Sequence, residues 1–385
     1  MVADVGALVS GECAPGFEAV GEAFAANFAE RGEVGAAVHV LVGGQVVVDL
    51  VGGWANEAGT RPWTADTLVN VYSVGKGLLS VLVLQLVDAG LLSLDTPISS
   101  VWPEFAAHGK ERVTVRDALC HRAGVPAIRE PLTDADLSDW ERMTSALAAS
   151  EPWFAPADGH AYHTNTFGHL LGEVVRRVTG QMPGERLREI AAPIGADVWW
   201  GLSDAELARC ADVIWAPARP LPGVDPHSLE GAAQMLALGY FNPPGYSSQG
   251  VVNTEAWRRA QVPATNGHGS ASGVARFYAA VIGALPGHAP LVSLGLMAEA
   301  ARVHSDGFCP VLGEEVQFGL GVTPTTARRP LGTSPRSFGH FGTGGALGFA
   351  DPDAGLAFGY VMNHVIPRWQ SSRNRALIDA LYSAL

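Results

Sequence analysis

The stretch Tyr72-Ser73-Val74-Gly75-Lys76 and the apolar run that follows it, Gly77-LLSVLVLQLVDAG-Leu91, decide how the rest of the chain must fold. The run contains no proline, carries apolar residues on nearly every side of a helix, and reaches a glycine stop at Gly90. A helix that is apolar all round is buried. The sequence therefore predicts a central buried helix with Ser73 at its N-terminus and Lys76 one turn along, on nearly the same side.

Lys76 is an unusual choice for such a helix. The chain has 25 basic residues, and only Lys76 and Lys110 are lysines. Arginine keeps its proton in a protein, whereas a desolvated lysine can become a neutral amine and act as a base. This indicates a serine nucleophile activated by a lysine. The alternative is a lysine that extends from the helix end to water, with Ser73 as an ordinary helix cap.

Length and charge limit the class of protein. A chain of 385 residues can bury about three quarters of its unfolded surface, and one large or two interleaved domains are expected. The formal net charge of −13 argues against nucleic acid or an anionic membrane as partner. Neither the length nor the charge of the chain predicts an oligomeric state.

We expect a cytoplasmic protein. The start of the chain, Met1 to Cys13, lacks the basic region and the cleavage site of a signal peptide. The apolar run after Ser73 is interrupted by Gln85 and Asp88 and is too short to span a bilayer. The cysteines are widely spread and are expected to be free thiols: Cys13, Cys120, Cys210 and Cys309.

Strand patterns lie near both ends of the chain. An amphipathic helix is predicted over 18–30, followed by a hairpin with strands at 36–42 and 45–51, for which Gly43 and Gly44 supply the turn. The hairpin strands are apolar on both faces, so helices should cover the sheet on at least one side. Further strands are predicted near 316–322, 337–342, 345–352 and 355–363, and a closing helix over 368–385.

The middle of the chain is predicted to be mainly helical. Helices are expected at 115–124, 134–150, 166–179, 203–210 and 271–285. The fold class is therefore α+β, with an antiparallel sheet built from both chain ends and flanked by helices, and with an inserted helical domain. We predict a sheet domain at 1–70 and 265–385, a helical domain at 71–264, and an active site in the cleft between them.

Tyr162 is the best candidate to assist Ser73. A proton taken from the serine must reach the leaving group, and a phenol can carry it. Tyr162 lies just before the helix predicted from Thr166, where its hydroxyl could project into a cleft. The alternative is a half-buried tyrosine that packs a loop. Tyr72 would point away from such a cleft and is predicted to pack.

Three nearby histidines do not predict a metal site. His160, His163 and His169 lack the spacing of a helical H-E-x-x-H motif and a defined third ligand. We expect no metal, and we expect His163 and His169 to be loop, core or helix-surface residues.

The last candidate for a functional segment is the glycine-rich stretch Phe338-Gly339-His340-Phe341-Gly342-Thr343-Gly344-Gly345. Where glycines leave a strand edge without side chains, a ligand can approach the backbone closely. Acyl transfer needs two N–H donors for the developing oxyanion, and we predict the backbone N–H groups of Ser73 and Thr343. The alternative is a glycine-rich turn between two strands.

Together these motifs resemble the serine β-lactamase and penicillin-binding protein superfamily. Ser73 and Lys76 match its S-x-x-K motif, Tyr162-His163-Thr164 matches its tyrosine motif, and His340 to Gly342 stand where Lys-Thr-Gly is usual. Leu119-CHRAGVP and Gly339-HFGTGGALGFADP are similar to its class VIII carboxylesterase branch, which is related to class C β-lactamases.

The resemblance implies a role for each matched residue. Ser73 would be the acylated nucleophile, and Lys76 and Tyr162 the general acid–base pair, without metal or organic cofactor. Which of the two is the base stays open. The substrate would be a small ester, with a short acyl chain, in contact with His340, Phe341, Gly342 and Trp153.

Two departures from the family favour neutral esters over β-lactams. His340-Phe341-Gly342 lacks the ammonium and the hydroxyl that help to hold a lactam carboxylate. Thr164 stands where Asn is common, which removes a contact to an amide side chain. We therefore expect weak or absent β-lactam turnover.

Other functions remain open. An acyltransferase, or an amide, D-peptide or β-lactam hydrolase, would use the same scaffold and differ only in what enters the cleft. A non-catalytic binding protein with this fold would leave Ser73 unreactive. An α/β-hydrolase is poorly supported because the chain contains no G-x-S-x-G.

Overall fold

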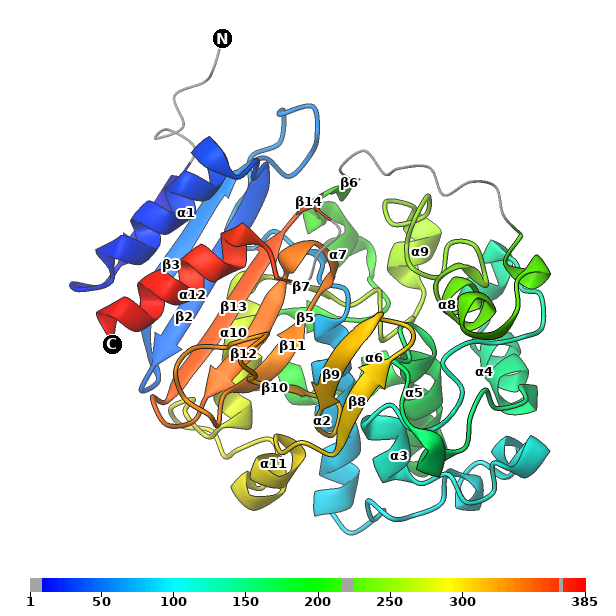
Figure 1. Ribbon diagram of the computed structural model, residues 1–385. Coiled ribbons are helices and arrows are strands. Elements are labelled where there is room, and N and C mark those ends of the chain that lie inside the picture. The colour runs from blue at the N-terminus through cyan, green and yellow to red at the C-terminus, as the bar shows by residue number, and fades with distance from the viewer. Residues whose placement is uncertain (1–8, 216–224, 367–369) are drawn as a thin grey trace.

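Seven antiparallel strands from the two ends of the chain form one sheet in this computed structural model, which describes residues 9–215, 225–366 and 370–385 (Figure 1). The strand order is β1-β3-β2-β13-β12-β11-β10. Their bounds are β1 Val9–Cys13, β2 Gly35–Val42, β3 Gln45–Gly53, β10 Thr323–Pro324, β11 Phe338–Phe341, β12 Leu347–Asp351 and β13 Leu356–Met362. The predicted α+β class with a sheet built from both chain ends is confirmed.

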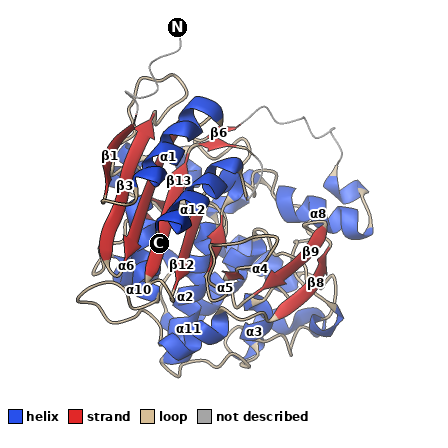
Figure 2. Ribbon diagram, turned by 60° about the vertical axis from the view of Figure 1, so that its left-hand side comes forward, coloured by secondary structure: helices blue, strands red, loops and turns tan. Residues whose placement is uncertain are grey.

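Helices cover both faces of the sheet, as the apolar pattern of its strands requires. β2 is buried along nearly its whole length. Helices α1 (Glu18–Glu30) and α12 (Ser372–Ala384) pack side by side on one face, and α10 (Ala271–Val281) lies against β2, β12 and β13 on the other (Figures 1 and 2). The β2–β3 turn uses Gly43 and Gly44 at φ 56° and 78°, a region that glycine enters without strain.

Helix α2 (Val74–Asp88) is the buried helix predicted after Ser73. It packs between β11 of the sheet and the helices α5 (Thr166–Thr179) and α6 (Pro183–Ala191). The remaining helices are α3 Val115–Leu119, α4 Trp140–Ala149, α7 Asp204–Arg209, α8 Gly231–Phe241, α9 Glu255–Arg259 and α11 Leu294–Ala300.

Short strands complete the framework. β4 (Val69–Asn70), β7 (His268–Gly269) and β5 (Val198–Trp199) form a three-stranded sheet. β14 (His364–Val365) pairs with β6 (Ile214–Trp215). β8 (Ser305–Cys309) and β9 (Glu314–Phe318) form a hairpin beside the helical part (Figure 1). The domain limits at residues 70 and 265 stay a prediction.

Several predicted helix limits are wrong, and local geometry explains two of them. α3 ends at Leu119 rather than Gly124, because His121 adopts a left-handed φ of 65° and the Arg122 N–H turns back to the Asp117 carbonyl at 2.6 Å. The helix expected over 134–150 is divided at Asp139, whose side chain accepts a hydrogen bond from the Arg142 N–H and so starts α4.

Other boundaries shift by a few residues, and some elements were not predicted. α10 ends at Val281 rather than Leu285, and β9 ends at Phe318. The sequence pattern did not predict the strands β1 and β8 or the helix α8. Residues 367–369, at the start of the expected closing helix, and residues 1–8 lie outside the described residues.

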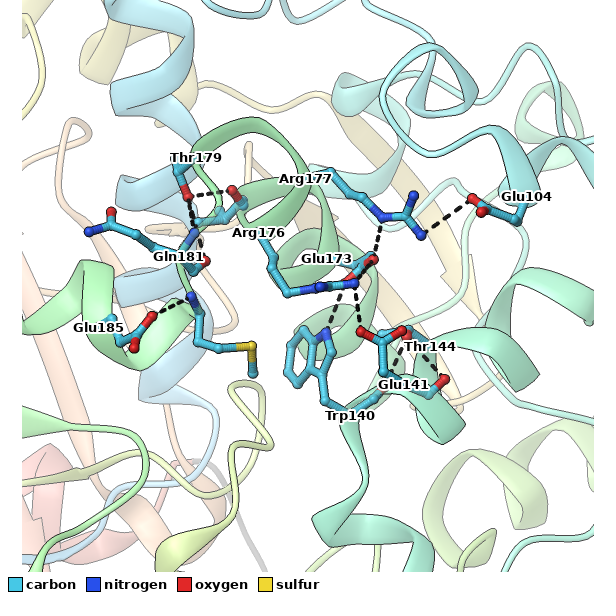
Figure 3. Close-up of polar contacts among 12 residues, drawn as sticks. Glu104, Trp140, Glu141, Thr144, Glu173, Arg176, Arg177, Thr179, Gln181 and Glu185 are labelled. Atoms are coloured by element: carbon cyan, nitrogen blue, oxygen red, sulfur yellow. Dashed lines mark hydrogen bonds and ion pairs between the residues drawn. The ribbon is translucent and has the colours of Figure 1, made fainter.

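A buried carboxylate fixes α5 to its neighbours (Figure 3). Glu173 accepts hydrogen bonds from Trp140 Nε1 at 2.8 Å, Arg176 Nε at 2.7 Å and Arg177 Nε at 2.6 Å. Burial raises the pKa of Glu173, but these donors outweigh burial, so the pKa is lowered and the group stays ionised. Arg176 and Arg177 lie on α5 itself, so the Trp140 hydrogen bond is the one of these three that joins α5 to α4.

Two further expectations concern the cysteines and the membrane. The four cysteines are free thiols, as predicted. Across residues 9–215, 225–366 and 370–385, no helix has the length and apolar character needed to cross a membrane.

Candidate active site

The first turn of α2 brings the Lys76 amine to the Ser73 hydroxyl. Lys76 Nζ lies 2.9 Å from Ser73 Oγ, on the same side of the helix, as the three-residue spacing predicts. The same nitrogen donates to the main-chain carbonyl oxygens of Thr164 at 2.6 Å and Ala264 at 3.1 Å. Lys76 is completely buried and Ser73 is 6 % exposed, so only the serine is open to an incoming molecule.

The surroundings of Lys76 favour the neutral amine. Burial lowers the pKa of Lys76 well below its usual value. Among the ion pairs of the described residues, none joins Lys76 to a carboxylate that would restore the charge. A neutral amine has two N–H groups and one lone pair. In the neutral form the two carbonyls would accept both N–H groups, and the lone pair would face the Ser73 O–H; in the charged form the third N–H would donate to Ser73 Oγ.

Tyr162 completes the group around Ser73. Its side chain is 1 % exposed, and Lys76 Nζ lies 4.7 Å from the centre of its ring. Burial raises the pKa of Tyr162, and a hydrogen bond with the Ser73 side chain opposes that rise. The structure thus places all three predicted catalytic side chains together, and it presents Tyr162 as a protonated phenol at neutral pH.

Histidines and a cysteine fix the loop that carries Tyr162. The Tyr162 N–H donates to Cys309 Sγ at 3.2 Å, and the His163 N–H donates to His121 Nδ1 at 3.1 Å. His163 Nε2 accepts from the Val125 N–H at 3.2 Å, so His163 Nδ1–H donates to the Ala161 carbonyl at 2.7 Å. These histidines serve as hydrogen-bonding supports.

The other two histidines of this region are also engaged. His160 Nε2 lies 3.2 Å from the Gly307 carbonyl, and His169 Nδ1 lies 2.7 Å from the Tyr246 hydroxyl. Burial lowers the pKa of His163 and of His169 to about 3, so both are neutral. No group of three or more histidine, cysteine, aspartate or glutamate side chains that could hold a metal occurs among the described residues.

The end of β11 approaches the start of α2 very closely. A Cβ atom on Gly342 would meet the Val71 carbonyl oxygen at 2.4 Å, so only glycine fits there. Val71 precedes Ser73 by two residues, and Thr343 follows Gly342. In the part of the chain that the structure describes, neither the Ser73 N–H nor the Thr343 N–H donates to another main-chain group. Both predicted oxyanion donors therefore remain available.

His340 and Phe341 have different surroundings. The His340 ring lies 6.5 Å from the Tyr162 ring, and its Nδ1–H donates to the Phe341 carbonyl at 2.8 Å. Burial lowers the pKa of His340 to about 3, so it is a neutral group beside Tyr162. The Phe341 side chain is fully buried in the main core. The expected contact between that ring and a substrate stays a prediction.

Tyr162 belongs to an apolar cluster that is separate from the main core. Trp153 packs against this cluster, and its expected contact with a substrate stays a prediction. Arg129 covers one face of its indole at 3.5 Å, and Trp153 Nε1 donates to the Ala127 carbonyl at 2.9 Å. The cluster includes Ala161, Met235, Cys309, Val311, Val316 and Phe318.

Sequence reasoning missed several residues that shape the site. The carbonyls of Thr164 and Ala264 orient Lys76, but any residue type supplies a carbonyl, so no sequence signal marks them. Phe318 stacks on the Tyr162 ring with centres 5.8 Å apart, and it comes from a hairpin that pairs far along the chain. His121 was visible only as part of the Leu119-CHRAGVP resemblance.

Comparison with known proteins gives the family. A family model described as Beta-lactamase matches residues 22–382. The chain belongs to the β-lactamase family. The esterase/β-lactamase LipL of Mycobacterium tuberculosis is 34% identical over 372 residues, which cover 94% of this chain and 85% of that protein.

Solved structures of the family agree with the fold. A family VIII carboxylesterase superimposes with a TM-score of 0.89 at 37% identity, over 98% of this chain and 100% of that one. A penicillin-binding protein homologue from Caulobacter crescentus gives a TM-score of 0.89 at 36% identity, over 98% and 100% of the two chains. The chain is thus a serine hydrolase of the β-lactamase family, and its predicted resemblance to the class VIII carboxylesterases is confirmed.

Proposed function

We propose that the protein is a carboxylesterase that hydrolyses small esters through an acyl-enzyme on Ser73, with Lys76 as the base. The observation that carries this proposal is the geometry of Lys76. Its Nζ lies 2.9 Å from Ser73 Oγ, the Thr164 and Ala264 carbonyls accept hydrogen bonds from it, and burial lowers its pKa. A lone pair aimed at a serine hydroxyl is what nucleophilic activation requires.

The first half of the reaction follows from these positions. Lys76 Nζ takes the Ser73 proton while Oγ forms a bond to the ester carbonyl carbon. The carbonyl oxygen becomes an oxyanion, for which the Ser73 and Thr343 N–H groups are the proposed donors. The intermediate collapses, the bond to the alcohol oxygen breaks, and that oxygen takes a proton from Tyr162, which regains one from the Lys76 ammonium.

The second half reverses the roles. Water enters, Lys76 takes one of its protons through Tyr162, and the hydroxide attacks the acyl-enzyme. The bond to Ser73 Oγ breaks, and Oγ recovers the proton. The high pKa of Tyr162 suits a group that passes protons on, whereas the lowered pKa of Lys76 suits the base.

The burial of the site supports small substrates. Ser73 is 6 % exposed, and Tyr162 and His340 are 1 % and 3 % exposed, so little room is open beside the nucleophile. The neutral His340 offers no positive charge to a carboxylate. Both features favour neutral esters with short acyl chains.

The test is labelling with a fluorophosphonate, read by intact mass, together with p-nitrophenyl acetate and butyrate assays. Wild type should gain one adduct, Ser73→Ala none, and ester turnover should be lost in Ser73→Ala and in Lys76→Ala. An unlabelled, inactive wild type would support a binding protein, and a label that persists in Ser73→Ala would show that another serine is the nucleophile. Products analysed with added alcohol separate hydrolysis from acyl transfer.

A further inference from the structure

A second cavity lies at the opposite end of α2 from Ser73. It has a volume of about 700 Å³, within the range of roughly 300 to 1,000 Å³ typical of small-molecule sites. α11, the end of α10 and strands β10 and β11 form its walls, and Figure 1 shows α11 below this edge of the sheet. Asp88, the last residue of α2, accepts hydrogen bonds from the Ser293 N–H at 2.9 Å and from Ser293 Oγ at 2.5 Å. Ser73, Lys76 and Tyr162 are not among the residues that line it, so this cavity is not part of the catalytic site.

The cavity is lined by apolar side chains, and some of them are exposed to solvent although core packing does not require them there. Met297 and Phe338 form a buried floor at 2 % exposure each. Leu294 and Val303 line the same cavity but are 55 % and 46 % exposed. Large apolar side chains left at the surface around a hollow are typical of a binding site.

The charged groups that line the cavity all have one sign. They are Arg302 and Arg336, and no acidic residue lines it among the described residues. Arg302 pairs with Glu299 at 3.2 Å, and Arg336 Nε pairs with Asp353 at 2.8 Å. Both arginine side chains are largely exposed, at 76 % and 62 %. Exposed ion pairs are weak, so a ligand anion can compete for either guanidinium.

We propose that this cavity binds a single-chain amphiphile, an alkyl carboxylate, with the alkyl chain against Met297 and Phe338 and the carboxylate at Arg302 and Arg336. Apolar burial supplies the affinity for the chain. A guanidinium fork matches a carboxylate, which supplies the preference for an anionic head. This site is independent of the proposed reaction at Ser73.

Two segments connect the cavity to the catalytic residues. Val303 leads into β8, whose Cys309 holds the Tyr162 N–H. Phe338 begins β11, which carries His340 and ends beside Ser73. A bound alkyl carboxylate therefore contacts elements that position Tyr162 and His340.

The test is calorimetric titration of Ser73→Ala protein with octanoate and, separately, with octan-1-ol, both below their aggregation limits. The Ser73→Ala background removes the catalytic nucleophile. Ala298→Trp fills the cavity from an exposed position of α11, and Ala29→Trp on the exposed side of α1 is the matched control. Arg302→Gln with Arg336→Gln removes both cations, and Arg259→Gln, an exposed paired arginine elsewhere, is its control.

We expect saturable binding of one octanoate, weakened at least tenfold by Ala298→Trp and unchanged by Ala29→Trp. The double arginine variant should weaken octanoate at least fivefold and leave octanol within twofold. Leu294→Gln should weaken the binding of both octanoate and octanol. It replaces Ala298→Trp in the test if that variant does not fold. No saturable binding, or binding that neither Ala298→Trp nor Leu294→Gln alters, overturns the site. Equal weakening of octanoate and octanol by the arginine variant overturns the carboxylate assignment.

Discussion

Lys76 and Lys110, the two lysines of the chain, hold their amines in nearly the same way. Lys76 Nζ donates to two main-chain carbonyls and lies 4.7 Å from the Tyr162 ring centre. Lys110 Nζ donates to the Ala107 and Ser150 carbonyls, both at 2.6 Å, and lies 5.3 Å from the Phe105 ring centre. Only Lys76 has a serine hydroxyl at 2.9 Å. The protein therefore contains its own control for a buried lysine without a nucleophile.

The first prediction compares the two lysines. Lys76→Met should lower kcat/KM for p-nitrophenyl butyrate by about 10²- to 10⁴-fold, the usual contribution of a general base. Lys76→Arg should be as inactive, because arginine cannot give up its proton. Lys110→Met should change kcat/KM by less than about threefold while losing comparable hydrogen bonds. Substantial activity in Lys76→Arg would refute the role of Lys76 as base.

The second prediction concerns stability and pH. Burial lowers the pKa of folded Lys76, whereas the unfolded chain has a lysine pKa of about 10.4. Between these two values the unfolded state binds one more proton, so this group makes the free energy of unfolding rise with pH, by about 1.4 kcal/mol per pH unit. The Met variant lacks this cost. Its advantage over wild type should be largest at pH 7 and should shrink toward pH 10.

Urea unfolding of wild type and Lys76→Met at pH 7, 8 and 9 measures that difference. Lys110, whose pKa burial lowers to about 8, should show the same slope only above pH 8. A stability difference between wild type and Lys76→Met that stays constant with pH would mean that Lys76 keeps its proton in the folded protein.

The sequence was informative where local pattern and tertiary packing agree. The run after Ser73 predicted α2 because a helix that is apolar on all sides must be buried in the core. Gly43 and Gly44 predicted the hairpin because the turn needs a positive φ at both positions. Ser73 and Lys76 came together because helical spacing alone sets their distance.

The third prediction isolates the Tyr162 hydroxyl. Tyr162→Phe keeps the ring that stacks on Phe318 and removes only the proton carrier. We expect kcat for p-nitrophenyl butyrate to fall about 10²-fold or more with little change in thermal stability. The loss of kcat should be larger for ethyl butyrate than for the p-nitrophenyl ester, because the alkoxide leaving group of ethyl butyrate needs a proton. Equal losses for the two esters would show that Tyr162 does not protonate the leaving group.

The fourth prediction tests the close approach of β11 to α2. Gly342→Ala places a Cβ 2.4 Å from the Val71 carbonyl oxygen, and backbone atoms must move apart. That movement separates Thr343 from Ser73, so kcat should fall about 10²-fold, as for loss of one oxyanion donor. Gly295→Ala, where an added Cβ meets nothing within 4 Å, is the matched control and should keep full activity.

The residues that sequence reasoning missed act through space or through the backbone. The Ala264 carbonyl reaches Lys76 across 188 positions of the chain, and no side-chain pattern marks an acceptor of this kind. The Phe341 ring was expected near the substrate because its motif stands where Lys-Thr-Gly is usual, and no pattern in the sequence indicated that the ring joins the main core. His121 ended α3 early because its left-handed φ is uncommon outside glycine.

The last prediction concerns β-lactams and rests on His340. Burial lowers its pKa to about 3, so it carries no charge at neutral pH and cannot attract a lactam carboxylate as an ammonium would. We expect kcat/KM for nitrocefin to be about 10- to 150-fold below that for p-nitrophenyl butyrate, since losing a charged hydrogen bond costs about 1.5 to 3 kcal/mol. Lowering the pH from 8 to 6 should leave this ratio unchanged, because His340 stays neutral throughout that range. Efficient nitrocefin turnover, or a ratio that rises steeply as the pH falls, would show that His340 gains a proton in the site.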